Sequence, residues 1–258
     1  MIIHTLGTSA GTQPYAGFHH TSIAIETQNG LYFFDAGECC AYTAHINGID
    51  LLKTKAIFIS HPHMDHVGGL GNLLWYIRKV GIAKQTPLGR EDNIDIFTPC
   101  LETVDGFMKV LQNTEGDFSC DYSHTVHKFA DGKIFDNADI SVTAVHTHHM
   151  PKKHFEYMSY SFRIECEGKT VVFSGDMRIE DIDDILPDRC DAFLVETGHH
   201  QIEDICEQIN RKMKKVDTLL FIHHGGYIMR DTDGASARAN AAFNGKVLIC
   251  RDGYSYKI

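Results

Sequence analysis

The chain has 258 residues, of which 43% are hydrophobic and 22% charged, and its formal net charge is −10 at pH 7. This composition is that of a globular protein with a sizeable core, and no apolar run reaches the length of about 18 residues that a membrane span needs. The excess of acidic residues argues against a broad surface that binds nucleic acid, since such surfaces collect Lys and Arg.

The N-terminus and the cysteines predict a cytoplasmic protein. Residues 1–6 have no basic segment followed by a long apolar run, so they predict no secretory signal peptide. The eight cysteines are scattered without a C-x-x-C pair, which predicts buried apolar side chains rather than a disulfide or zinc framework. Because no repeat, linker or low-complexity segment interrupts the chain, we expect a single domain over residues 1–258.

The first two thirds of the chain are rich in short strands. Apolar residues recur at helical spacing over 67–80, and a second helix is expected at 103–111. Gln28-Asn29-Gly30 and Glu167-Gly168-Lys169 predict hairpin turns. The expected strands are 2–6, 21–27, 31–34, 56–59, 94–97, 140–145, 160–166 and 170–173.

In the last third, strands and helices alternate. Strands are expected at 191–195, 219–222, 246–249 and 254–258, and helices at 202–213 and 235–243. A meander of strands followed by this alternation suggests two packed sheets with helices outside.

Histidine is unusually frequent, with 17 residues, and its densest cluster follows an apolar strand. The segment Ser60-His61-Pro62-His63-Met64-Asp65-His66 places four metal-ligand side chains between this strand and a helix. In an extended segment His61 and His63 can project together onto one ion, and Asp65 and His66, past a turn, can serve a second ion.

This motif resembles the H-x-H-x-D-H motif of the metallo-β-lactamase superfamily, and the resemblance covers nearly the whole chain. It implies an α/β fold of four layers, an αββα sandwich of two mixed β-sheets with helices outside. The next ligand of the family is a histidine after a strand; His146, His148 and His149 compete for it, and His149 fits best. Asp176 in Phe173-Ser174-Gly175-Asp176 matches the bridging aspartate of the family.

The last ligand of the family corresponds to His223 or His224, and the His-x-Gly pattern favours His223. The resemblance then implies one ion on His61, His63 and His149, a second on Asp65, His66 and His223, and Asp176 between them. Nitrogen and carboxylate ligands without thiolate suit two Zn²⁺ ions, with Mn²⁺ or Fe²⁺ as alternatives.

Within the superfamily, three segments resemble the tRNA 3′-processing nucleases and related phosphodiesterases. These are Leu6-Gly7-Thr8-Ser9-Ala10-Gly11-Thr12, Tyr160-Ser161-Phe162-Arg163-Ile164 and Val195-Glu196-Thr197. Glu196 matches the glutamate of the family's His-Glu-Ala-Thr segment, but Val195 stands where the family has histidine. Residues 150–175, between His149 and Asp176, leave no room for the long tRNA-binding arm of those nucleases.

The resemblance implies hydrolysis by a hydroxide that bridges the two ions, with Asp65 both a ligand and the group that orients this hydroxide. Glu196 is a further catalytic candidate, and His148 and His199, with His154 and His200 as alternatives, are candidates for protonating the leaving group. We expect a phosphodiesterase for a small or cyclic phosphodiester; the alternatives are a lactone, thioester or other carboxylic-ester hydrolase, and a non-catalytic metal or ligand sensor. The expected partner is a small anionic molecule, which Lys152 and Lys153 could contact. We expect no binding to tRNA, to long nucleic acid or to a membrane.

Overall fold

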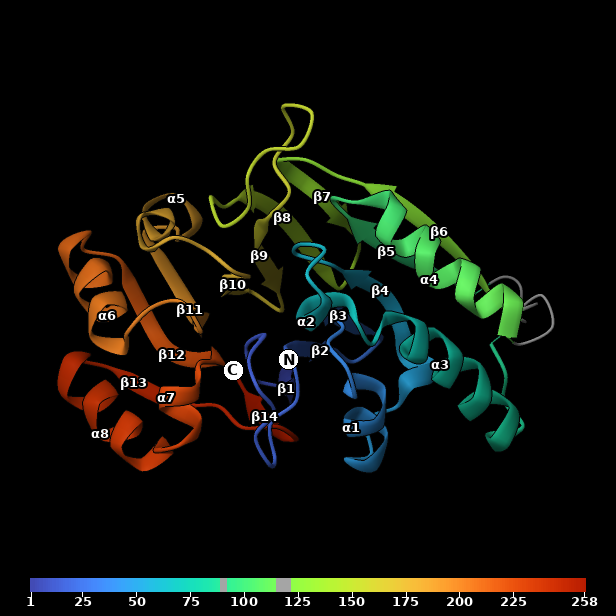
Figure 1. The fold of residues 1–258 in the computed structure, drawn as a ribbon, viewed down its shortest axis with the longest axis horizontal. Helices are drawn as coiled ribbons and strands as arrows, with labels where there is room; N and C mark the ends of the chain where they lie inside the picture. The colour runs from blue at the N-terminus through green and yellow to red at the C-terminus, as the bar shows by residue number, and fades with distance from the viewer. Residues whose placement is uncertain (89–91, 115–121) are drawn as a thin grey trace.

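The computed structural model describes residues 1–88, 92–114 and 122–258. Within this part of the chain, the strands form two sheets of seven strands each, with helices against the outer face of both (Figure 1). The order of helices, sheet, sheet and helices is the four-layer arrangement that the sequence predicts, so this expectation is confirmed.

The first sheet has the strand order β14-β1-β2-β3-β4-β5-β6. Its antiparallel half joins the two ends of the chain, because β14 pairs with β1, whereas β3 to β6 run parallel. The strands are β1 (Ile2–Gly7), β2 (Ser22–Glu26), β3 (Leu31–Phe34), β4 (Thr54–Phe58), β5 (Asn93–Thr98), β6 (Ser123–Lys128) and β14 (Tyr254–Lys257).

The second sheet has the order β13-β12-β11-β10-β9-β8-β7. It is parallel from β10 to β13 and antiparallel from β7 to β10. The strands are β7 (Gly132–Asp136), β8 (Ile140–His146), β9 (Tyr160–Cys166), β10 (Lys169–Phe173), β11 (Arg189–Thr197), β12 (Lys215–His224) and β13 (Lys246–Ile249).

The helices divide between the two sheets in chain order, as Figure 1 shows. The first sheet carries α1 (Cys40–Ile46), α3 (Leu70–Lys84) and α4 (Leu101–Thr114), and the second carries α5 (Ile182–Ile185), α6 (Ile202–Arg211) and α8 (Thr232–Ala242). Two short helices, α2 (Met64–Val67) and α7 (Gly226–Met229), and the 3₁₀ turns η1 (Leu51–Lys53) and η2 (Ile179–Asp181) lie in connections. The buried residues accordingly form three apolar layers, one between the sheets and one under each set of helices.

Successive residues of a central strand serve different layers. In β3, Phe33 packs under the helices of the first sheet, whereas Phe34 faces the space between the sheets. Phe34 stacks on Phe58 of β4 at 5.0 Å between ring centroids, and Phe58 stacks on Phe97 of β5 at 4.9 Å. Both faces of these strands are buried, which explains why the sequence shows apolar runs there rather than polar–apolar alternation.

The structure differs from the sequence expectations at several elements. The helix expected over 67–80 is two helices, α2 and α3, separated at Gly68 and Gly69; a Cβ on Gly69 would lie 2.2 Å from the carbonyl oxygen of Gly37. The helix α1 and the strands β6 and β7 were not expected. Cys120 lies outside the described residues; the other seven cysteines form no disulfide, and all but Cys39 are buried. In the described part of the chain, no helix has the length and apolar character needed to cross a membrane.

We expect Phe58→Ala to lower the free energy of unfolding by about 3–5 kcal/mol, because it removes a fully buried ring from the layer between the sheets. Urea denaturation monitored by circular dichroism measures the change. Tyr42→Ala on α1 is the control, since the side chain is 52% exposed and its removal should change stability by less than about 0.5 kcal/mol. Equal effects of the two substitutions would contradict this account of the core.

Candidate metal centre

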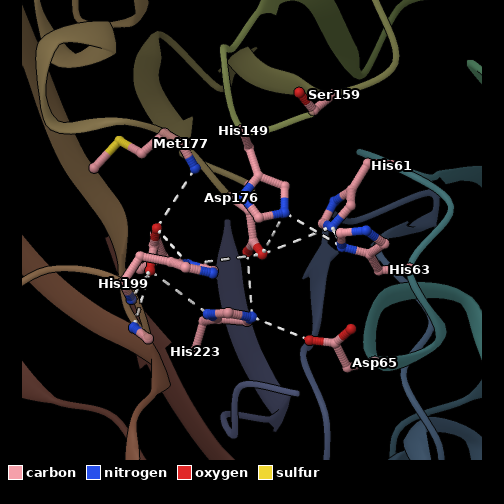
Figure 2. A network of polar contacts seen from close by, with 12 residues as sticks. His61, His63, Asp65, His149, Ser159, Asp176, Met177, His199 and His223 are labelled. Carbon is pink, nitrogen blue, oxygen red and sulfur yellow. Dashed lines mark hydrogen bonds and ion pairs between the residues drawn. The ribbon is translucent and has the colours of Figure 1, made fainter. Parts of the chain in front are cut away.

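The histidine and aspartate residues singled out by the motif meet where strands of both sheets end. His61 and His63 follow β4, and Asp65 and His66 lie on α2, so the first sheet supplies one side. The second sheet supplies three residues, each at or after the end of a strand: His149 after β8, Asp176 after β10 and His223 in β12. Figure 2 shows the labelled side chains of this set pointing toward one another: His61, His63, Asp65, His149, Asp176 and His223.

The first group of donor atoms comprises His61, His63, His149 and Asp176. His63 Nδ1 lies 3.0 Å from His61 Nε2 and 3.2 Å from His149 Nε2. Asp176 Oδ2 lies 3.6 Å from His61 Nε2 and 3.5 Å from His149 Nε2. Three imidazole nitrogens and one carboxylate oxygen thus converge on one point.

The second group comprises Asp65, His66 and His223. The Nε2 atoms of His66 and His223 are 3.1 Å apart, and His223 Nε2 lies 3.2 Å from Asp65 Oδ2. The other oxygen of Asp176, Oδ1, lies 3.1 Å from His66 Nε2 and 3.2 Å from His223 Nε2. The carboxylate of Asp176 therefore presents one oxygen to each group.

The donor set and its hydrogen bonding fit divalent metal. Asp176 Oδ1 is buried and has no hydrogen bond of normal geometry among the described residues, although two imidazole nitrogens lie within 3.2 Å. A buried carboxylate oxygen that faces two imidazole nitrogens without such a bond is placed as it would be around a shared cation. Imidazole and carboxylate donors without thiolate are the set that Zn²⁺, Mn²⁺ and Fe²⁺ accept.

Burial and charge shift the titration of the cluster in opposite directions. Burial alone would raise the pKa of Asp176, but His223, His66 and His61 outweigh it and hold that pKa well below its usual range. Burial would lower the pKa of His66, yet the carboxylates of Asp176 and Asp35 raise it well above its ordinary value. The carboxylates thus favour a positive charge at these nitrogens, and a dication would compete with protons for the same lone pairs.

The alternative histidines have partners elsewhere. His224 is buried, with Nδ1 2.9 Å from Thr197 Oγ1 and Nε2 2.8 Å from the carbonyl oxygen of Cys250. Burial lowers the pKa of His224 to about 4. His146 pairs with Asp131 at 2.8 Å and His148 with Asp181 at 2.5 Å. The structure therefore brings His149 and His223 into the cluster, and places His146, His148 and His224 outside it.

Glu196 and His199 form a pair beside the cluster. The carboxylate of Glu196, at the end of β11, accepts hydrogen bonds from the backbone N–H groups of Gly198 and His199 and lies 3.0 Å from His199 Nδ1. Burial would raise the pKa of Glu196, but the contacts with His199 and His223 lower it to about 2. The His199 ring stacks on His223 at 5.7 Å, and Nδ1 lies 3.9 Å from Asp176 Oδ2, so His199 is also close enough to be a ligand.

The sequence analysis missed Asp35, which orients the segment that carries His61, His63 and His66. Asp35 is fully buried after β3; its Oδ2 lies 2.6 Å from His66 Nδ1, and both oxygens accept hydrogen bonds from Ser60. The hydrogen bond fixes which nitrogen of His66 faces the cluster, a common role of a carboxylate behind a metal-binding imidazole. The only signal in the sequence was an aspartate directly after the apolar run 31–34; the parallel pairing of β3 and β4 places it beside the histidines after β4.

The fold and this site define a member of the metallo-β-lactamase superfamily of metal-dependent hydrolases. Two solved structures superpose over almost the whole chain. YhfI from Bacillus subtilis has a TM-score of 0.72 and 17% identity, over 99% of both chains. The short form of human tRNase Z has a TM-score of 0.70 and 17% identity, over 100% of this chain and 99% of its own. A diphosphatase described as from the PhnP family has a TM-score of 0.65 and 14% identity over 100% of this chain and 97% of its own. Within the superfamily, the chain belongs to the family described as anti-Pycsar protein Apyc1, which it matches over residues 1–203.

Curated relatives support the resemblance to the tRNA 3′-processing branch. Ribonuclease Z from Methanothermobacter thermautotrophicus is 31% identical over 151 residues, which are 58% of this chain and 45% of the relative. The matches to the first relatives thus span about half of their length. The chain is therefore related to these nucleases, and its substrate has to be inferred from its own site.

We expect Asp35→Asn to weaken Zn²⁺ binding about 10- to 100-fold, because an amide no longer supports His66 as the carboxylate does. Competition with a fluorescent chelator measures the affinity. Asp131→Asn is the matched control, since Asp131 bonds His146 in the same way outside the cluster and should leave the affinity unchanged. A similar loss in both variants would show that Asp35 has no specific role at the metal centre.

Proposed function

We propose that the chain is a phosphodiesterase that binds two divalent metal ions and hydrolyses a small or cyclic phosphodiester. The observation that carries this proposal is the position of Asp176, with one oxygen toward each of two nitrogen-rich donor groups. Two adjacent dications suit phosphoryl transfer, in which negative charge is spread over several oxygens.

The pocket at the cluster favours a small substrate. It measures about 280 Å³, and its lining includes Asp65, His149, Asp176, His199 and His223. This volume is near the lower end for small-molecule sites, about 300–1,000 Å³. Together with the net charge of −10 and the short segment between His149 and Asp176, it argues against a long nucleic acid as substrate.

The names of the relatives support phosphorus rather than carbon as the centre attacked. The first curated relatives are named ribonucleases, and one structural neighbour is named a diphosphatase; both names describe hydrolysis at phosphorus. These likenesses support the reaction class that we propose, and the dimensions of the pocket support a small substrate.

The residues of the site have different roles in the proposed reaction. Bound metal ions would supply Lewis acidity at the phosphoryl oxygens and lower the pKa of water near them. His61, His63, His149, Asp65, His66 and His223 would hold the two ions, with Asp176 between them. Asp65 also lines the pocket, where its carboxylate can orient the attacking water.

His199 is the residue that we assign to protonation of the leaving oxygen. Its ring is exposed to the pocket, and its Nδ1 is held by Glu196, which leaves Nε2 for the substrate. The contact with Glu196 also raises the pKa of His199, although partial burial opposes this shift. His148 is the weaker candidate, because its ring is bonded to Asp181 outside the cluster.

We expect the purified protein to contain about two metal ions per chain and to release p-nitrophenolate from bis(p-nitrophenyl) phosphate until a chelator is added. Elemental analysis and absorbance measure the two quantities. Asp176→Asn should abolish turnover, because an amide is a much weaker ligand than a carboxylate for the metal ion at each of the two donor groups.

Other outcomes would redirect the assignment. If the protein binds metal and cleaves lactones or thioesters but no phosphodiester, the atom attacked is a carbonyl carbon and not phosphorus. Metal binding without any turnover would favour a sensor. Failure to bind metal even after reconstitution would overturn the proposal.

We expect His199→Ala to lower kcat about 100-fold or more on a cyclic mononucleotide, whose leaving group is a ribose oxygen that must be protonated. The same variant should lose less than about tenfold on bis(p-nitrophenyl) phosphate, since p-nitrophenolate leaves without a proton. Steady-state kinetics on both substrates, with metal content measured in parallel, give the comparison.

His148→Ala separates the two histidine candidates. If the leaving-group dependence appears in His148→Ala instead, His148 is the proton donor and the assignment of His199 is wrong. If His199→Ala loses metal and both activities together, His199 is a ligand, as its distance to Asp176 allows.

A further inference from the structure

Two histidines at the end of β8 lie outside the metal centre, and each is held by a carboxylate in the same way. His146 donates its backbone N–H to Asp131 Oδ1 at 2.6 Å, and its ring Nδ1 lies 2.8 Å from Asp131 Oδ2. His148 repeats the arrangement on Asp181: its backbone N–H donates to Oδ2 at 2.8 Å, and Nδ1 lies 2.5 Å from Oδ1. Both imidazoles are therefore fixed in orientation from behind.

The two carboxylates determine which ring nitrogen of each histidine can bind a further group. An ionised carboxylate only accepts hydrogen bonds, so Nδ1 of each ring carries the proton and Nε2 keeps its lone pair. Metal-binding histidines are commonly supported in this way, by a carboxylate at the nitrogen that does not face the ion. Within the metal centre, Asp35 supports His66 by the same contact. His146 and His148 are thus oriented as ligands are, although both lie outside the donor cluster.

The two rings lie at nearly the spacing that is found between ligand rings inside the metal centre. Their centroids are 5.3 Å apart, with 73° between the ring planes. The corresponding values are 4.6 Å and 77° for His61 and His63, and 5.1 Å and 85° for His63 and His149. His146 and His148 also share the i, i+2 spacing of His61 and His63 at the end of a strand. This spacing allows one dication to bridge the two rings.

The surroundings of the pair favour a weakly held ion. The side chains of His146 and His148 are 28% and 48% exposed, so water would supply the remaining ligands of an ion. The His146 ring stacks on Tyr157 at 3.6 Å between centroids, which holds it in place. Lys152 Nζ lies 3.9 Å from the centroid of the same tyrosine ring, and its charge opposes a bound dication. An ion at this pair should therefore bind more weakly than ions in the donor cluster.

We propose that His146 and His148 form a peripheral site for an exchangeable divalent metal ion, in addition to the ions of the metal centre. Imidazole nitrogens suit Zn²⁺, whereas Mg²⁺ and Ca²⁺ prefer oxygen ligands. The site shares no ligand with the donor cluster, so it does not rest on the proposed hydrolysis of a phosphodiester. Thr147, between the two histidines, donates from Oγ1 to the carbonyl oxygen of Asp176 at 2.7 Å. The pair therefore adjoins the metal centre without belonging to it.

Titration with Zn²⁺ of the protein whose metal centre is already loaded tests the site. We expect a further equivalent to bind at free Zn²⁺ concentrations above those that fill the donor cluster, as measured by equilibrium dialysis and elemental analysis. His146→Ala should abolish this equivalent and keep the ions of the metal centre, because one imidazole and water hold Zn²⁺ poorly. Asp131→Asn should weaken the further equivalent about 10- to 100-fold and leave the tighter ions unaffected.

His127→Ala is the matched control for the loss of an imidazole. The His127 side chain is 39% exposed, and its ring lies 2.7 Å from a carboxylate oxygen of Asp95, but no histidine stands two residues away from it. The variant should keep the further equivalent of Zn²⁺. A further equivalent that persists unchanged in His146→Ala, or that is lost equally in His127→Ala, would overturn the site.

Chemical modification gives a second readout that needs no variant. Diethyl pyrocarbonate modifies imidazole nitrogens that carry a free lone pair, and peptide mass spectrometry locates the modified residues. We expect His146 and His148 to react in the protein with a loaded metal centre, and an excess of Zn²⁺ to protect both while leaving the reaction of His127 unchanged. Absence of a further equivalent in the wild type, or no protection of the pair by Zn²⁺, would refute the proposal. The protection experiment decides this site even if the donor cluster binds no metal, which would overturn the proposed function alone.

Discussion

The buried carboxylate of Asp176 is the group on which the rest of the site depends. A carboxylate removed from water is strongly unfavourable unless positive charge or hydrogen bonds compensate it. Here the compensation comes from imidazoles on two sides, and Oδ1 has no conventional hydrogen bond among the described residues. The carboxylate of Asp176 and the imidazoles around it therefore stabilise one another's charge.

This requirement ties the site to the packing of the two sheets. The first sheet positions His61, His63 and His66, and the second sheet positions Asp176 and His223. The aromatic layer between the sheets fixes the distance across which these groups meet. Strands β4, β10 and β12 lie in the parallel parts of the sheets and supply residues at their carboxyl ends, where α/β folds commonly place their sites.

The sequence predicted the layers, the central strands and the histidine motif, because apolar runs and ligand spacing are local patterns. It did not predict α1, which is seven residues long, or β6 and β7, whose side chains are partly exposed and show no clear periodicity. The choice between His223 and His224 depended on an irregularity at the end of β12, where His223 has φ 48° and the register with β11 shifts. Asp35 was missed because its role comes from its neighbour β4, which is distant in the sequence.

The metal centre and the N-terminal loop over residues 11–18 meet at His224. Its backbone N–H donates to Thr8 and its carbonyl oxygen accepts from Ala10, so the base of the N-terminal loop is hydrogen-bonded to the residue next to His223. The ring of His224 is locked by Thr197 and Cys250, which keeps this junction rigid. A displacement of the loop would therefore be transmitted to a member of the donor cluster. The position of the loop and the geometry of the cluster are thus linked through backbone hydrogen bonds.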